Sequence, residues 1–337
     1  MKVAIFSTLP HDREYLDAAN RNGRHELVYF EHSLKKETAP IARGFDGVCA
    51  FVNDRIDRAC IEILHSLHIK VIALRCAGFN QVDLQAAHDY GIPVLRVPAY
   101  SPHAIAEHAV ALILTLNRKT HKAYNRVREG NFSAVRLTGF DLYGKTAGVI
   151  GTGKIGSAFA RIMMGFGCRV LAYDRHPSKT LEEQGIVYTG LDELYAESDI
   201  ISLHCPLTPE TYKMINETSI AKMKEGVMLI NTSRGKLVST SSVIRGLRER
   251  KIGYLGIDVY AQEENLFFRD LSEILIEDEA INTLMTFPNV LVTAHQAFMT
   301  REALEEIART TLHNLDDLDT GRQLVNEVKL DVLQGKK

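Results

Sequence analysis

The chain has 337 residues, of which 45% are hydrophobic and 24% are charged, and its formal net charge is −2 at pH 7. These totals are typical of a soluble globular protein of about two domains, and they exclude a strongly basic, nucleic-acid-binding chain. No apolar run approaches the roughly 18 residues of a membrane-spanning helix. The five cysteines lack metal-site spacing, so we expect buried free thiols in a cytoplasmic protein.

Short β-branched runs alternate with helical segments along the chain, which indicates an α/β fold with parallel sheets. The strands expected in the first region are residues 2–6, 47–51, 71–74 and 94–97, with a helix at 58–67. A long helical stretch follows from Pro102 to about Arg128, with apolar residues three and four positions apart. We expect this stretch to cross into a second domain and to be a candidate dimer surface.

A second strand–helix series follows this stretch. Its expected strands are residues 146–151, 169–174, 199–204, 227–231, 254–259 and 290–293. Residues 264–287 are loop-rich and partly helical, and an amphipathic helix from Thr300 to about Asp316 returns to the first domain. The sequence therefore predicts two doubly wound, Rossmann-like parallel-sheet domains separated by a cleft. Residues 1–100 plus 299–337 form a flavodoxin-like domain, and residues 101–298 form the other.

The segment after the first strand of the second domain has the G-x-G-x-x-G spacing, at Gly151, Gly153 and Gly156. Such a loop turns tightly, admits the pyrophosphate of a dinucleotide and places it at a helix N-terminus. Asp174 ends the next expected strand, about 20 residues further on, where a carboxylate binds ribose hydroxyls. This acid favours NAD over NADP, although Arg175 beside it could accommodate a 2′-phosphate.

Three polar residues follow strands of the second domain, namely Arg234, Glu263 and His295. Because ligands bind at the carboxyl ends of parallel strands, we expect the three side chains to converge there. Arg234 offers a planar fork for a carboxylate and can polarise a carbonyl. His295 can give a proton to the oxygen of a ketone that accepts hydride, and Glu263 can orient and stabilise the imidazolium. These residue types suit reduction of a 2-oxo acid.

Several motifs together resemble the D-2-hydroxyacid dehydrogenase family over nearly the whole length, with the fermentative D-lactate dehydrogenases as its nearest branch. The stretches that carry the resemblance are Ile72–Asn80, Val97–Tyr100, Gly148–Gly156, His204–Glu210, Ile230–Gly235, Gly256–Tyr260 and His295–Phe298. The resemblance implies NAD-dependent, reversible reduction of pyruvate to D-lactate, with residues 1–100 plus 299–337 as the substrate domain and 101–298 as the NAD-binding domain.

The resemblance also assigns roles to single residues. Arg234, Glu263 and His295 are implied to be catalytic. The N–H groups of Ala77 and Gly78 hold the substrate carboxylate, with help from the Tyr100 hydroxyl, and Phe298 walls the substrate pocket. Asp258 is implied to bind the nicotinamide carboxamide. The full set expected to bind the cofactor is Gly151, Gly153, Lys154, Ile155, Gly156, Asp174, Cys205, Pro206, Thr232, Ser233 and Asp258.

Other activities stay open on the sequence alone. A dehydrogenase for bulkier 2-oxo acids would use the same residues, with a different pocket near Phe298. Glu263 disfavours formate dehydrogenases, which pair their histidine with glutamine. A phosphoglycerate dehydrogenase with a regulatory domain is disfavoured because no such segment follows residue 337, while a simpler form stays open. A non-enzymatic NAD(H)-sensing scaffold, like the carboxyl-terminal-binding corepressors, shares the fold and a similar triad.

The expected partners are a small substrate, pyruvate or D-lactate, and further copies of the chain in a homodimer or homotetramer. We expect no nucleic-acid, membrane or metal partner. His103, Glu107 and His108 match neither of the zinc-binding spacings H-E-x-x-H and H-x-x-E-H, so they are expected to be solvent-facing or cleft-lining polar residues.

Overall fold

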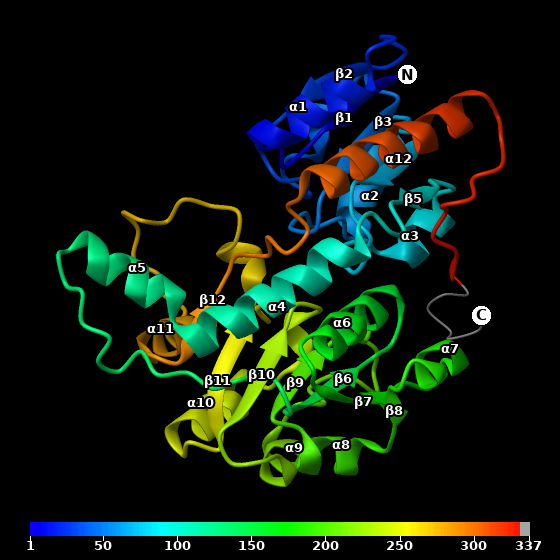
Figure 1. Cartoon of the computed structure of the whole chain (residues 1–337). Coiled ribbons are helices and arrows are strands. Elements are labelled where there is room, and N and C mark those ends of the chain that lie inside the picture. The colour runs from blue at the N-terminus through cyan, green and yellow to red at the C-terminus, as the bar shows by residue number, and fades with distance from the viewer. Residues whose placement is uncertain (331–337) are drawn as a thin grey trace. The chain divides into compact units, whose positions relative to one another are not determined.

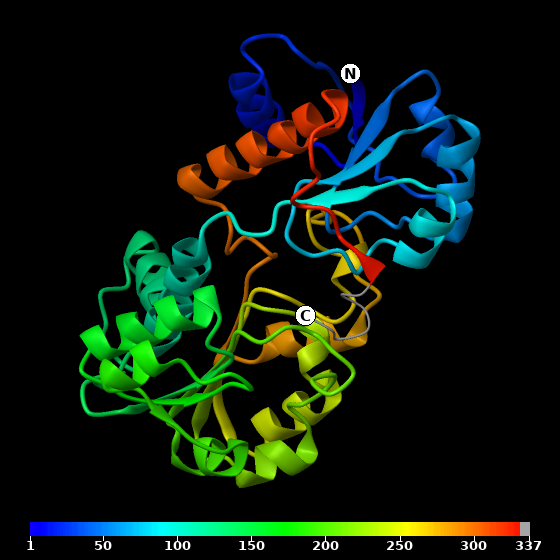
Figure 2. The ribbon, with the colours of Figure 1, turned by 90° about the vertical axis from the view of Figure 1, so that its right-hand side faces the viewer.

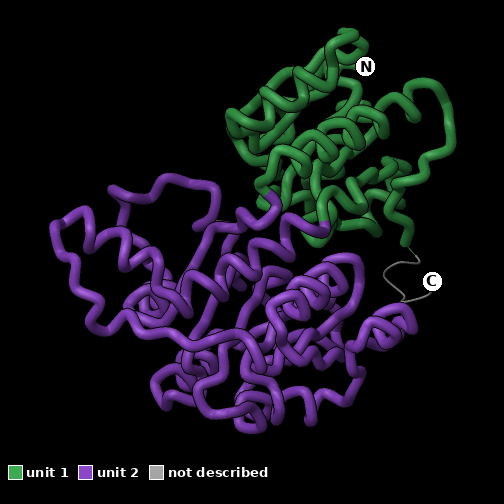
Figure 3. The backbone as a smooth tube through the Cα atoms, viewed as in Figure 1, with its two compact units in different colours: residues 1–101, 299–337 green, residues 102–298 purple. Residues whose placement is uncertain are grey.

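The computed structural model describes residues 1–330 and divides into two compact units (Figure 3). Unit 1 is Met1–Ser101 together with Met299–Lys337, and unit 2 is Pro102–Phe298. The chain therefore passes between the units twice, and its last helix belongs to the unit in which the chain begins.

Unit 1 is a five-stranded parallel sheet of order β2-β1-β3-β4-β5. Its strands are β1 (Lys2–Ile5), β2 (Glu26–Tyr29), β3 (Gly47–Ala50), β4 (Val71–Leu74) and β5 (Val94–Arg96). Its helices are α1 (Pro10–Ala19), the 3₁₀ helix η1 (Ala39–Ala42), α2 (Arg58–Ser66), α3 (Leu84–Asp89) and α12 (Arg301–Asp319). The strand order is that of a doubly wound flavodoxin-like sheet. Figure 2 shows α1 and α12 on one face of the sheet and α2 and α3 on the other.

Unit 2 is a seven-stranded parallel sheet of order β12-β11-β10-β9-β6-β7-β8 (Figure 1). Its strands are β6 (Thr146–Ile150), β7 (Arg169–Tyr173), β8 (Val187–Tyr188), β9 (Ile200–Leu203), β10 (Val227–Asn231), β11 (Ile252–Ile257) and β12 (Val290–Val292). Its helices are α4 (Pro102–Arg118), α5 (Thr120–Arg128), α6 (Lys154–Gly165), α7 (Lys179–Glu183), α8 (Leu191–Glu197), α9 (Glu217–Lys222), η2 (Gly235–Leu237), α10 (Thr240–Arg248), η3 (Glu263–Asn265) and α11 (Glu279–Thr286). Successive strands are added on one side of β6 up to β8 and on its other side from β9 onward, and such sheets bind dinucleotides at this switch between β6 and β9. The two predicted parallel-sheet folds are confirmed.

The sequence prediction of one helical stretch from Pro102 to about Arg128 was wrong in one respect. The stretch is two helices, α4 and α5, that meet at Lys119. The backbone φ of Lys119 is 52°, in the left-handed region, which stops one helix before the next begins. Lysine is a good helix former, so its side chain gives no signal of this break.

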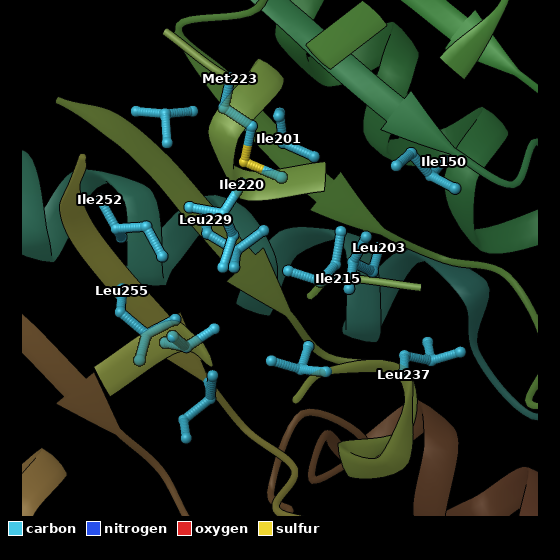
Figure 4. Close-up of a cluster of buried hydrophobic side chains, with 14 of the residues drawn as sticks. Ile150, Ile201, Leu203, Ile215, Ile220, Met223, Leu229, Leu237, Ile252 and Leu255 are labelled. Atoms are coloured by element: carbon cyan, nitrogen blue, oxygen red, sulfur yellow. The ribbon is translucent and has the colours of Figure 1, made fainter. Parts of the chain in front are cut away.

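The core of unit 2 covers both faces of its sheet. Figure 4 shows Leu229 of β10 among apolar side chains of neighbouring strands and loops on one face. Met228 and Ile230 stand on either side of Leu229 in β10 and point to the opposite face of the sheet. They pack with residues of α4 and α6. Because successive side chains of a strand point to opposite faces, both faces are filled. A ligand is therefore best accommodated at the ends of the strands, where the loops lie.

Candidate active site

The glycine loop after β6 requires glycine for two different reasons. Gly151 has a φ of 93°, and a Cβ built there would lie 2.7 Å from the backbone nitrogen of Cys205. A Cβ at Gly156 would lie 1.9 Å from the carbonyl oxygen of Gly151. Gly153, by contrast, faces open space and begins α6 as an N-cap without a side-chain hydrogen bond. Lys154 and Ile155 follow in the first turn of α6. Because no side chain caps this helix N-terminus, its N–H groups are open to an anionic ligand.

Asp174 directly follows β7 and is tied to the glycine loop. Its carboxylate accepts hydrogen bonds from the backbone N–H of Thr152 at 2.6 Å and of His176 at 2.9 Å. Burial raises the pKa of Asp174, but these N–H donors outweigh it and hold that pKa below its ordinary value. Asp174 is therefore ionised, as ribose binding requires. Arg175, which could otherwise bind a 2′-phosphate, forms an ion pair with Glu210 at 3.3 Å.

Two further loops of the expected cofactor set meet after β9 and β10. The Ser233 hydroxyl donates a hydrogen bond to the Cys205 carbonyl at 2.8 Å, which joins them. Thr232 Oγ1 is buried and has no hydrogen-bond partner in residues 1–330, so a ligand atom can satisfy it. Burial raises the pKa of the Cys205 thiol to about 11, so this thiol stays protonated; Pro206 beside it is exposed. The residues at these strand ends fit a dinucleotide.

Arg234 lies in the turn after β10. The Asn231 side chain fixes this turn, because its amide donates to the Arg234 carbonyl at 2.9 Å and its oxygen accepts from the Ser233 N–H at 3.1 Å. The next residue is Gly235, where a Cβ would lie 2.1 Å from the carbonyl carbon of Tyr260. The turn that carries Arg234 therefore packs directly against the loop after β11, which carries Glu263.

Glu263 and His295 form a pair in unit 2. The Nδ1 atom of His295 lies 3.0 Å from Oε1 of Glu263, and the other carboxylate oxygen accepts the Tyr260 N–H at 2.9 Å. The side chains are 18% and 24% exposed, so the pair is partly shielded from water. His295 has a φ of 52°, a strained region for a residue with a Cβ, and its N–H is held by the Asp258 carbonyl at 2.8 Å.

The Asp258 side chain is wholly buried and serves the loop that carries His295. It accepts hydrogen bonds from the N–H groups of Gln296 and Ala297, both at 2.9 Å, and from the Thr293 hydroxyl at 2.6 Å. Burial raises the pKa of Asp258, but these bonds and His108 hold it below its ordinary value. Asp258 therefore stabilises the turn from which the imidazole projects.

His108, on α4, was expected to be a solvent-facing or cleft-lining polar residue, with no role assigned to it. Its Nε2 lies 3.1 Å from Thr293 Oγ1 and 3.4 Å from Asp258 Oδ1, so it joins the network beneath the His295 loop.

No group of three His, Cys, Asp or Glu residues within residues 1–330 could hold a metal ion. All five cysteines are buried, and none forms a disulfide within residues 1–330.

The residues expected to bind the substrate carboxylate belong to unit 1. Ala77 and Gly78 follow β4, and neither N–H group donates a hydrogen bond to another described residue. Tyr100 is partly exposed in the segment after β5. Phe298, the last residue of unit 2, is 6% exposed. Unit 1 thus contributes two adjacent free backbone donors, a pattern suited to a carboxylate.

A glycine loop at a helix N-terminus, an ionised carboxylate after the next strand and a His–Glu pair on one sheet are typical of an oxidoreductase that uses a nicotinamide cofactor. Comparison with known proteins specifies the class. The family model described as "D-isomer specific 2-hydroxyacid dehydrogenase, NAD binding domain" matches residues 110–297, all within unit 2. The D-lactate dehydrogenase of Escherichia coli (strain K12) is 52% identical over 328 residues, 97% of this chain and 100% of that one.

Solved structures agree with this match over the whole chain. The pyruvate reductase of Chlamydomonas reinhardtii is 46% identical, has a TM-score of 0.92 and covers 97% of this chain and 98% of its own. A D-2-hydroxyisocaproate dehydrogenase is 31% identical, has a TM-score of 0.84 and covers 97% and 99%. The chain therefore belongs to the D-isomer specific 2-hydroxyacid dehydrogenases, and its cofactor is NAD. No helix within residues 1–330 is both long and apolar enough to cross a membrane.

Proposed function

We propose that this chain is a D-lactate dehydrogenase that reduces pyruvate to D-lactate with NADH, and that the reaction is reversible. The observation that carries the proposal is the His295–Glu263 pair, 3.0 Å apart, on the same sheet as the glycine loop. The likeness to a D-lactate dehydrogenase and to a pyruvate reductase supports the choice of substrate.

In this proposal the residues of unit 2 act on the keto group. When bound, the cofactor supplies a hydride to the carbonyl carbon. Protonated His295 donates its Nε2 proton to the oxygen, because its Nδ1 atom is engaged by Glu263. The Glu263 carboxylate stabilises the imidazolium and fixes the ring. Arg234 binds the acid and polarises the carbonyl, so that negative charge on oxygen is stabilised as it develops.

For unit 1 we propose a role in binding the substrate carboxylate. The free N–H groups of Ala77 and Gly78 donate hydrogen bonds to the substrate carboxylate, and the Tyr100 hydroxyl assists them. Phe298, the last residue of unit 2, lines the pocket for the substrate side chain. For Asp258 we propose a positioning role, through the turn that it holds, in addition to the nicotinamide contact that the family resemblance implies.

The cofactor residues act together in this proposal. The glycine loop with Lys154 and Ile155 binds the pyrophosphate, and Asp174 binds the adenosine ribose. Thr232 and Ser233, with Cys205 and Pro206, line the remaining cofactor surface. NAD is preferred over NADP because the ionised Asp174 repels a 2′-phosphate and Arg175 is already paired with Glu210.

We also propose that the chain forms a homodimer, or a homotetramer built from such dimers, in the cytoplasm. Large apolar side chains are exposed on α5 and in the loop after it: Tyr124 is 62%, Phe132 79% and Val135 68% exposed. Exposed apolar patches of this kind mark protein interfaces, and a second copy in two-fold symmetry is the commonest occupant.

Initial rates of NADH oxidation against a panel of 2-oxo acids test the proposed function. We expect the highest kcat/KM with pyruvate and lower values with 2-oxoisocaproate and phenylpyruvate. A preference for the bulky acids would retain the chemistry and reject pyruvate as the substrate. NADH binding without turnover of any of these acids would reject the enzyme and favour the sensing scaffold.

A further inference from the structure

Arg96, the last residue of β5, projects onto the loop that carries Ala77 and Gly78. Its Nη1 atom donates a hydrogen bond to the Ala77 carbonyl at 3.0 Å, and its guanidinium carbon lies 5.2 Å from the centroid of the Phe79 ring. Its backbone is fixed on both sides: its N–H donates to the Asn326 carbonyl at 3.1 Å, and its carbonyl accepts from the Asn314 side chain at 2.9 Å. The position of this guanidinium is therefore set by three segments of unit 1.

Among residues 1–330 the Arg96 cation has no carboxylate partner and forms no ion pair, although it is half-buried. Burial lowers the pKa of Arg96 from its ordinary value, yet arginine stays protonated at any physiological pH. A half-buried charge without a counter-ion is unfavourable unless something else compensates it. A negatively charged ligand nearby would do so.

The contact of Arg96 acts on the peptide group that carries one of the two free donors. The Ala77 carbonyl and the Gly78 N–H belong to the same peptide unit. The Gly78 carbonyl is engaged as well, by Cys76 Sγ at 3.2 Å and the Gln81 amide at 3.4 Å. With the carbonyls occupied, the loop presents N–H groups. A cationic donor on the carbonyl oxygen polarises the peptide and makes its N–H a stronger donor.

We propose that Arg96 is a positioning residue for substrate recognition. It strengthens the hydrogen bonds that the Ala77 and Gly78 N–H groups donate to the substrate carboxylate. This inference rests on the proposed function, which places that carboxylate on these two groups. Arg96 touches the loop and not the substrate, so it acts on affinity for the acid and leaves the hydride and proton steps to unit 2.

The test compares Arg96→Gln, Arg96→Lys and, as a matched charge control, Arg43→Gln. Arg43 is an exposed arginine that directly follows η1 and precedes β3, the central strand of the same sheet, and it has no side-chain partner in residues 1–330. We expect Arg96→Gln to raise the KM for pyruvate at least tenfold, or about 1.4 kcal/mol, with kcat within about threefold. Arg96→Lys keeps the charge and should stay within about threefold of the parent KM. The control and NADH affinity should not change.

Calorimetric binding of oxamate, an unreactive carboxylate with the shape of pyruvate, to the enzyme–NADH complex gives a readout that does not depend on turnover. We expect its Kd to rise in Arg96→Gln in parallel with KM. An unchanged KM and Kd in a parent enzyme that reduces pyruvate would overturn the role of Arg96 alone. Equal losses in the Lys and Gln variants would assign the effect to packing and overturn it too. A parent chain that neither binds oxamate nor reduces pyruvate would overturn the proposed function itself.

Discussion

Replacing Glu263 with glutamine removes a charge next to His295 while keeping the shape of the side chain. Two unit charges about 4 Å apart interact by about 4 kcal/mol at an effective dielectric constant of about 20. The two side chains are 18% and 24% exposed, so solvent screens part of this energy. Hydrogen bonds to charged groups are worth about 1.5–3 kcal/mol net, and the lower half of that range suits this pair. Since about 1.4 kcal/mol is a factor of ten in rate, we expect Glu263→Gln to lower kcat for pyruvate reduction at least about tenfold.

The direction of the effect follows from the proton that His295 must donate. Pyruvate reduction needs the imidazolium, which the Glu263 carboxylate stabilises by its charge and by its contact with Nδ1. Glutamine keeps the shape of the side chain but not its charge, so the reduction should slow while the affinity for NADH stays that of the parent.

The assay is kcat for pyruvate reduction and the Kd of NADH, in the parent and in Glu263→Gln. Glu264→Gln is the matched control, because Glu264 is an exposed carboxylate next in the chain and forms no hydrogen bond or ion pair within residues 1–330. Its kcat should match that of the parent. A Glu263→Gln variant with the kcat of the parent would refute the pairing, and so would an equal loss in Glu264→Gln.

Four further changes have expected outcomes. His295→Ala should lower kcat by about 10²–10⁴-fold with NADH affinity retained; equal loss of NADH affinity in a folded variant would reject the acid–base role. Gly156→Ala places a Cβ 1.9 Å from a backbone oxygen, so NADH titration should show at least tenfold weaker binding, and parental binding would contradict the close approach. Asp258→Asn should lower the free energy of unfolding by about 1–3 kcal/mol near pH 7, because buried donors lose their acceptor. Since the pKa of Asp258 is held below its ordinary value, this difference should be present above about pH 4 and shrink as the pH falls further in urea titrations. Phe132→Glu should shift sedimentation towards the monomer, and an unchanged assembly would place the interface elsewhere.

The strands that the sequence predicted well are those buried on both faces. Runs such as 227–231 are apolar without interruption, which is typical of parallel strands between two layers of helices. The strands β2 and β8 were missed because β2 is an edge strand that is half-exposed and begins with Glu26, and β8 has only two residues. Their patterns are too weak or too short to separate from loops.

The candidate site was predictable where one physical rule applies. The carboxyl ends of parallel strands share an edge, so polar residues after β10, β11 and β12 could be placed in one region from their positions alone. Arg96 and His108 follow no such rule. Arg96 meets a carbonyl 19 residues away, and His108 meets a hydroxyl 185 residues away, through packing between segments. No spacing in the sequence indicates either contact.

The most direct measurement of the central claim is the configuration of the lactate that the parent chain forms from pyruvate and NADH, determined by chiral chromatography. The account predicts D-lactate as essentially the whole product, because the chain belongs to the D-isomer specific 2-hydroxyacid dehydrogenases. L-lactate as the product, or no lactate at all from a chain that binds NADH, would contradict it.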